Sequence, residues 1–274
     1  MFEQILENVR GSGPLIHCIT NYITTNDCAN IILACGASPT MAEAEQEAAE
    51  IAAIAGAVDI NIGNLNTMTV AAMHKAIAAA NQNHVPVILD PVGAGASSYR
   101  MDTLRDFFAN YRFAVIRGNV SELLAVGGVA SNTKGVDAGA ADAVTEENLE
   151  GRVAFFKQLS ARLDAVVSVS GAIDIIASPE KAYICRNGHP MMSCVTGTGC
   201  MLSALTAAFC GGNHENILEA AAAATAVMGV AGDIAYQKTM EAGQGTGSFR
   251  VYLMDAVNLM DAETLNGGMK IEVR

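Results

Sequence analysis

Glycine and small hydroxyl residues gather at one point of the chain, directly before an apolar segment. Residues 196–200 read TGTGC, and residues 201–205 read MLSAL. Glycines let the backbone turn tightly, and the first N–H groups of a helix lack partners inside that helix. The helix dipole favours an anion at the same place. The pattern is compatible with a phosphate site formed by Gly197, Thr198, Gly199 and Cys200, and also with a tight turn that binds no ligand, since it matches neither the Walker A motif nor the dinucleotide motif GxGxxG.

A second group of residues combines a cation with a carboxylate. Residues 117–122 read RGNVSE. Arg117 carries a permanent charge that suits nucleotide phosphates. Asn119 followed by Glu122 has the spacing of a capping box, which is a structural role. The functional alternative is that Glu122 helps to hold Mg²⁺, directly or through water, together with Asp90 from another predicted strand.

Short apolar runs alternate with longer helical patterns along most of the chain. Such runs indicate a parallel sheet covered by helices on both faces, so the fold class is α/β with a central, mainly parallel sheet. We expect a β-hairpin at 174–186, a mostly helical stretch over 200–261, a surface loop over 128–145, and one domain spanning 1–274. The predicted strands are 15–20, 58–63, 85–91, 113–118 and 165–171, and the predicted helices are 23–35, 42–55, 67–82, 145–163 and one beginning at 120.

Four predicted strands end in residues that could contact a ligand. Asn21, Asn64, Asp90 and Arg117 each lie at or just after a strand end. In an open parallel sheet, ligands bind beyond the carboxyl ends of the strands. We therefore expect these side chains to meet the glycine motif at one edge of the sheet.

Composition excludes several classes of function. The formal net charge is −12, which argues against a nucleic-acid or anionic-membrane surface. The seven cysteines show no CxxC and no zinc-ligand spacing, so we expect free thiols in a reducing cytoplasm. The first residues lack the pattern of a signal peptide, and the alanine-rich stretch 219–230 is short for a membrane span. The expected location is cytoplasmic.

Seven segments, in order along the chain, resemble those of hydroxyethylthiazole kinases, which belong to the ribokinase-like superfamily. Each segment alone has moderate specificity, and the resemblance runs through nearly the whole chain. The resemblance implies a ribokinase-like fold. The segments are HCITNY (17–22), LACGASPTM (33–41), NIG (61–63), DPVGA (90–94), RGN with Glu122 (117–122), GTGC (197–200) and GTGSF (245–249).

The resemblance also implies an activity and a set of roles. The activity is ATP-dependent phosphorylation of the thiazole alcohol for thiamine phosphate synthesis or salvage. Met41, through its backbone amide, and Gly197 would contact the alcohol, Arg117 and Ser170 would contact ATP, and Asp90 and Glu122 would belong to a Mg²⁺ region. Such kinases are typically homotrimers with sites between subunits, so Asn21 would bind substrate or complete a partner's site.

Cys200 occupies the position where ribokinase-like enzymes generally have Asp, the acceptor of the alcohol's proton. The chain resembles hydroxyethylthiazole kinases in having Cys there. A helix N-terminus lowers the pKa of a thiol, whereas burial raises it, and the sequence leaves that balance open.

Three other functions remain open from the sequence. A kinase for hydroxymethylpyrimidine or pyridoxal would share the fold, but the segment 33–41 and Cys200 argue against it. An ADP/ATP-dependent nucleotide-hydrate dehydratase would rely on Asp where this chain has Cys200. A non-catalytic nucleotide-binding protein would not need Arg117, Glu122 and the glycine motif on one edge of the sheet.

Overall fold

A single mixed sheet forms the centre of the protein. The computed structural model describes residues 1–129 and 143–274. Within these residues the nine strands lie in the order β2-β1-β3-β4-β5-β6-β7-β8-β9. They are β1 (Leu15–Ile19), β2 (Ser38–Thr40), β3 (Ala57–Asn61), β4 (Val87–Asp90), β5 (Val115–Asn119), β6 (Val166–Ser170), β7 (Asp174–Ala177), β8 (Ala182–Cys185) and β9 (Ile271–Val273).

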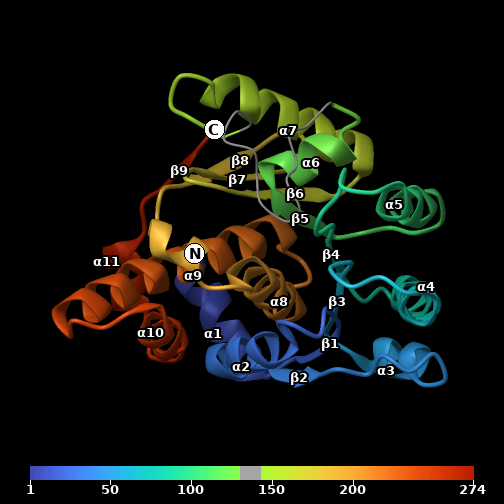
Figure 1. Ribbon diagram of the computed structural model, residues 1–274, viewed down its shortest axis with the longest axis horizontal. Helices are drawn as coiled ribbons and strands as arrows, with labels where there is room; N and C mark the ends of the chain where they lie inside the picture. The colour runs from blue at the N-terminus through green and yellow to red at the C-terminus, as the bar shows by residue number, and fades with distance from the viewer. Residues whose placement is uncertain (130–142) are drawn as a thin grey trace.

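Helices cover both faces of this sheet (Figure 1). Each face and the helices that cover it share one buried apolar cluster. One face carries α1 (Phe2–Ser12), α2 (Thr25–Cys35), α8 (Thr198–Gly211), α9 (Ile217–Glu241), α10 (Thr246–Asn258) and α11 (Ala262–Gly268). The other carries α3 (Ala48–Ile54), α4 (Thr67–Gln82), α5 (Ser98–Asn110), α6 (Val120–Val126) and α7 (Leu149–Leu163). A short 3-10 helix, η2 (Pro190–Cys194), precedes α8.

The predicted α/β class is confirmed. Strands β2, β1, β3, β4, β5 and β6 pair in parallel, and β7, β8 and β9 continue the sheet antiparallel. The predicted hairpin is present as β7 and β8. Most of the predicted surface loop 128–145 lies outside the described residues.

Two helical predictions need correction. The helix predicted over 42–55 begins only at Ala48. Residues 42–44 have no regular structure, with the carbonyl of Ala42 bonded to the His17 side chain, and residues 45–47 form a turn. The alanine-rich stretch belongs to α9, which has 25 residues and is long and apolar enough to cross a membrane. However, 72% of its most apolar window is buried inside the protein, which is typical of a core helix.

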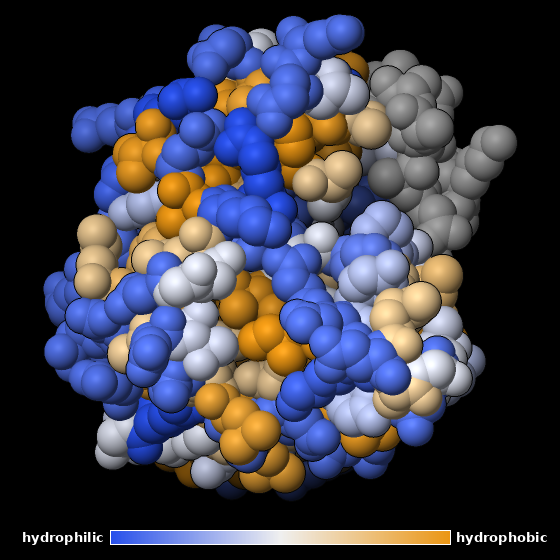
Figure 2. All heavy atoms as spheres, turned by 90° about the vertical axis from the view of Figure 1, so that its left-hand side faces the viewer, coloured by the Kyte–Doolittle hydropathy of each residue, from blue (hydrophilic) through white to orange (hydrophobic). Residues whose placement is uncertain are grey.

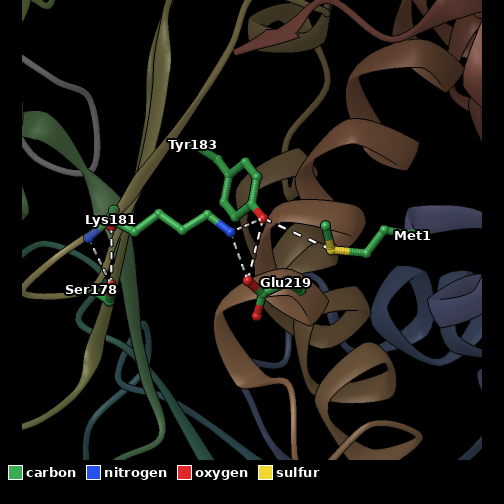
Figure 3. A network of polar contacts seen from close by, with 5 residues as sticks. All are labelled: Met1, Ser178, Lys181, Tyr183 and Glu219. Carbon is green, nitrogen blue, oxygen red and sulfur yellow. Dashed lines mark hydrogen bonds and ion pairs between the residues drawn. The ribbon is translucent and has the colours of Figure 1, made fainter. Parts of the chain in front are cut away.

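A polar cluster joins the antiparallel part of the sheet to α9. Lys181, just before β8, donates a hydrogen bond to the Tyr183 hydroxyl and pairs with Glu219 at 3.0 Å (Figure 3). The Tyr183 hydroxyl also lies 3.3 Å from Glu219 and 4.0 Å from the sulfur of Met1. These contacts hold β8 against the first turn of α9 and the N-terminal residue.

Polar side chains replace apolar ones where the parallel strands end beneath α8. The strand register sets Asn61 of β3 beside Asp90 of β4, and Arg117 of β5 beside Ser168 of β6. All four are buried. Burial of such groups is costly unless they are hydrogen-bonded, so their arrangement indicates a functional site.

Candidate active site

Two glycines bring the start of α8 close to other parts of the chain. Gly197 caps the helix with φ 89°, and a Cβ at this position would lie 2.5 Å from Cγ2 of Thr24. A Cβ on Gly199 would lie 3.0 Å from Nη1 of Arg117. Any side chain at 197 would be strained and would clash, and one at 199 would push the guanidinium away. The predicted glycine turn is therefore present, with a cation beneath the helix N-terminus.

Arg117 and Ser170 lie together, as an ATP site would require. The guanidinium Nη2 donates to the Ser170 hydroxyl at 2.6 Å. Arg117 is 5% exposed, and its Nε has no partner among the described residues. A buried guanidinium with unused donors next to free helix N–H groups is a suitable anion site.

Cys200 lies in the first turn of α8 between two asparagine side chains. Asn21 donates to its sulfur at 3.3 Å and Asn61 at 3.2 Å. The sequence predicted that Asn21 binds substrate or completes a partner's site. In the structure, Asn21 lies in the candidate site of its own chain.

The balance that the sequence left open at Cys200 favours the neutral thiol. Burial, followed by the charge of Asp90, raises the pKa of Cys200 to about 11. Hydrogen bonds from Thr24, Asn61 and Asn21 lower the pKa by less. At neutral pH Cys200 is therefore protonated, and it can act as a weak acceptor rather than a strong base.

The two candidate magnesium residues lie close to this turn, but they are held differently. One oxygen of Asp90 accepts hydrogen bonds from Ser203 at 2.7 Å and Asn61 at 2.8 Å. Glu122 forms the capping box with Asn119 through one oxygen and accepts from the Gly93 N–H at 2.8 Å through the other. The structural role expected for Glu122 is therefore present.

The electrostatics of these acids are compatible with a cation nearby. Burial raises the pKa of Asp90, and Arg117 opposes that shift. Burial and the charge of Asp90 raise the pKa of Glu122 to about 7. Among the described residues no group of three or more His, Cys, Asp or Glu is placed to hold a metal ion. Two carboxylates fit Mg²⁺, which usually binds one or two carboxylates together with phosphate oxygens and water.

Met41 follows β2 and is positioned by a histidine that the sequence did not assign to the site. His17 of β1 is fully buried, and its Nε2 lies 2.7 Å from the carbonyl of Ala42. Burial lowers the pKa of His17, so the ring is neutral and donates this hydrogen bond. His17 thus fixes the backbone at Met41, whose side chain is half-buried.

Sequence reasoning also missed Asn61, Ser203 and Asp59. Asn61 lies in the NIG segment. However, its contact with Cys200 and the contact of Ser203 with Asp90 join residues far apart in the chain, so the sequence does not reveal them. Asp59 lies inside β3 with both carboxyl oxygens buried and unpartnered among the described residues. The only sequence signal was an acidic residue inside an apolar strand.

Asp59→Asn is expected to stabilise the protein increasingly as pH rises. Burial, with the charge of Asp90 nearby, raises the pKa of Asp59 well above its usual value. The folded state then binds a proton that the unfolded state has lost, so this group's contribution is fully present below the unfolded pKa and declines as pH rises. Calorimetry from pH 5 to pH 8 should show the variant's Tm advantage growing. An advantage that shrinks over this range would contradict a protonated Asp59.

The chain is similar over nearly its whole length to known proteins of one family. The chain matches the model of the hydroxyethylthiazole kinase family over residues 6–263. It is 47% identical over 272 residues to a hydroxyethylthiazole kinase of Clostridium acetobutylicum, covering 99% of each chain. The solved hydroxyethylthiazole kinase of Pyrococcus horikoshii OT3 has a TM-score of 0.87 at 33% identity, covering 100% of this chain and 98% of the other. A pyridoxal kinase from Staphylococcus aureus, covering 95% of this chain and 97% of its own, is similar at a TM-score of 0.60 and 13% identity, which shows the fold alone.

Proposed function

The chain belongs to the hydroxyethylthiazole kinase family, and we propose that it transfers the γ-phosphoryl group of ATP to the alcohol of hydroxyethylthiazole, for thiamine phosphate synthesis or salvage. The observation that carries the proposal is the glycine turn at Gly197–Cys200 lying over the buried Arg117. The ribokinase-like fold expected from the sequence is confirmed by the solved relative. We also propose that residues 1–274 act as one kinase domain, because one sheet takes strands from near both ends of the chain.

The roles follow from where each group lies. The N–H groups at Gly197–Cys200 and the guanidinium of Arg117 stabilise charge on the transferred phosphoryl group, which is the main task in phosphoryl transfer. Ser170 orients Arg117. Mg²⁺ would neutralise phosphate charge when bound, and Asp90 and Glu122 would hold it.

Glu122 would act on that ion through water. Each of its oxygens already accepts a backbone N–H, and those two bonds fix the loop at Gly93 and the start of α6. A bridging water leaves both bonds intact. Met41 would contact the alcohol through its backbone amide, at a position fixed by His17.

The first test of this function is acceptor dependence. Purified protein with ATP and Mg²⁺ should release ADP when hydroxyethylthiazole is added and should release little without it. ADP release that ignores the acceptor would contradict a kinase and favour a nucleotidase. Turnover of a nucleotide hydrate instead would favour the dehydratase alternative.

Cys200→Asp is expected to keep kinase activity at or above that of the unchanged protein. A carboxylate is a better proton acceptor than a neutral thiol, and the two asparagine donors around Sγ suit an anion. Cys200→Ala should retain at least about 1% of kcat, because general base help contributes about 10²- to 10⁴-fold and a weak base sits at the low end. An inactive, folded Cys200→Asp protein that still binds ATP would overturn the acceptor role.

We further propose a cytoplasmic homotrimer with sites at subunit interfaces, and neither nucleic acid nor membrane as partner. Tyr22 and Ile23, directly after Asn21, are 79% and 62% exposed, so together they offer an apolar surface that a partner subunit would cover in the trimer. Apolar groups also lie among polar ones on the side that carries α10 and α11 (Figure 2). All seven cysteines are free, as expected in a reducing compartment.

The trimer has a direct test. Light scattering should give three times the chain mass of 28.4 kDa. Replacing Tyr22 and Ile23 with serine should shift the protein toward monomer. A monomeric but fully active unchanged protein would refute the interface.

A further inference from the structure

We propose that Asn61 and Asn21 are positioning residues whose amide groups form a donor cradle, and that this cradle holds the side chain at position 200 as a hydrogen-bond acceptor. Both amides converge on the Cys200 sulfur, at 3.2 and 3.3 Å. The inference rests on the proposed function and specifies which side chains its site accepts at position 200.

The orientation of the Asn61 amide is fixed by its neighbours. Its oxygen accepts the Gly63 backbone N–H at 2.9 Å, and a backbone N–H can only donate. Its nitrogen must then face the Asp90 carboxylate, at 2.8 Å, and the Cys200 sulfur. In the opposite orientation the Asn61 NH₂ group would face the Gly63 N–H, and the Asn61 oxygen would face the Asp90 carboxylate. Both contacts would be repulsive, so Asn61 presents an N–H group to position 200.

The orientation of the Asn21 amide is fixed in the same way. Its oxygen accepts the Thr24 backbone N–H at 3.2 Å. Its nitrogen therefore faces the Asn61 oxygen, at 3.2 Å, and the Cys200 sulfur. Both asparagines are at least 95% buried, so water competes little for these donors.

Gly63 allows the two amides to come this close. A Cβ at Gly63 would lie 2.9 Å from the Asn61 oxygen and 3.0 Å from the Asn21 Cβ. The glycine in the NIG segment thus has a physical reason: its N–H reaches Asn61 while its missing side chain leaves room for Asn21.

The cradle connects two parts of the site. A single NH₂ group of Asn61 contacts both Asp90, a proposed magnesium residue, and position 200. A cradle made of donors matches an acceptor side chain, so aspartate should fit best, cysteine less well, and alanine should leave the donors unused.

The test is a set of double-mutant cycles. Asn61→Ser is combined with the unchanged Cys200, with Cys200→Asp and with Cys200→Ala, and both Tm without ligands and steady-state kinetics are measured. We expect Asn61→Ser to lower Tm by about 3 °C more in the Cys200→Asp protein than in the Cys200→Ala protein. The reason is that a hydrogen bond to a charged acceptor contributes more to stability than one to a neutral group. We also expect it to lower kcat about tenfold more in the Cys200 and Cys200→Asp proteins than in the Cys200→Ala protein, with the KM for ATP unchanged.

The loss of the Asn61–Asp90 bond is common to all backgrounds, so it cancels in the comparison. Equal losses in all three backgrounds would overturn the inference, since a merely structural asparagine acts independently of position 200. Asn213→Ser is the matched control: Asn213 is also buried and hydrogen-bonded at both ends of its amide, but it lies beyond the far end of α8. It should lower Tm equally in every background and leave kcat unchanged.

These measurements separate the inference from the function on which it rests. If no background shows activity with hydroxyethylthiazole, the proposed function fails, and the Tm comparison alone then decides for or against the cradle. If the kinase is active but both cycles are additive, the function stands and the cradle is refuted.

Discussion

Arg117→Gln is expected to lower kcat by about 10²- to 10³-fold, the usual cost of removing one preorganised donor from a site where charge develops. The guanidinium is buried beneath the first turn of α8, and its contact with Gly199 leaves no room for a side chain there. Water cannot replace it easily at that depth. Glutamine keeps most of the volume but loses the charge.

Two comparisons make this result interpretable. Arg117→Lys should recover only part of the activity, because a lysine cannot both bond Ser170 and present a second donor to phosphate in the same plane. Arg112→Gln, at an exposed arginine before β5 paired with Asp164, should leave kcat unchanged. A folded Arg117→Gln protein with full activity would exclude Arg117 from the phosphate site.

Gly197→Ala is expected to lower kcat by about 10²-fold and to reduce Tm as well. The residue has φ 89°, which costs a non-glycine residue about 1 to 3 kcal/mol, and the added Cβ would lie 2.5 Å from Cγ2 of Thr24. The helix start must shift to relieve this clash. A misplacement of about 1 Å can cost about 10²-fold in rate.

The control for this variant is a glycine that lies inside a helix. Gly151 of α7 has open space where a Cβ would lie, so Gly151→Ala should keep full activity and raise stability by about 0.5 to 1 kcal/mol. Calorimetry and steady-state kinetics on both variants give the comparison. If Gly197→Ala loses Tm but keeps kcat, the turn is a structural cap and not the phosphate site.

Much of the fold could be predicted because its central strands are continuous apolar runs followed by helices. The edge strands β2 and β9 could not be, because each has only three residues, which is too few to show a strand pattern. Strand β2 exists because it pairs with β1, and β9 because it pairs with β8. These are tertiary contacts that a local pattern does not contain.

The residues of the site also divide into those that the sequence could predict and those that it could not. Gly197, Gly199, Arg117 and Asp90 could be proposed from sequence because glycines before a helix and charged residues at strand ends have a direct chemical meaning. Asn61 could not, because its role depends on Cys200, 139 positions away in the chain. The pKa of the Cys200 thiol could not be predicted from sequence either. Burial raises it and hydrogen bonds lower it, and the balance between them depends on neighbours that only the structure identifies.

Thiazole kinase activity is tested most simply by magnesium-dependent ADP release with a panel of acceptors. Hydroxyethylthiazole, hydroxymethylpyrimidine, pyridoxal and a blank without acceptor are compared at equal concentration, and products are identified by mass spectrometry. We expect ADP release with the thiazole far above the other three, together with the thiazole phosphomonoester. Folded protein that binds ATP but does not turn over the thiazole would contradict the proposed function.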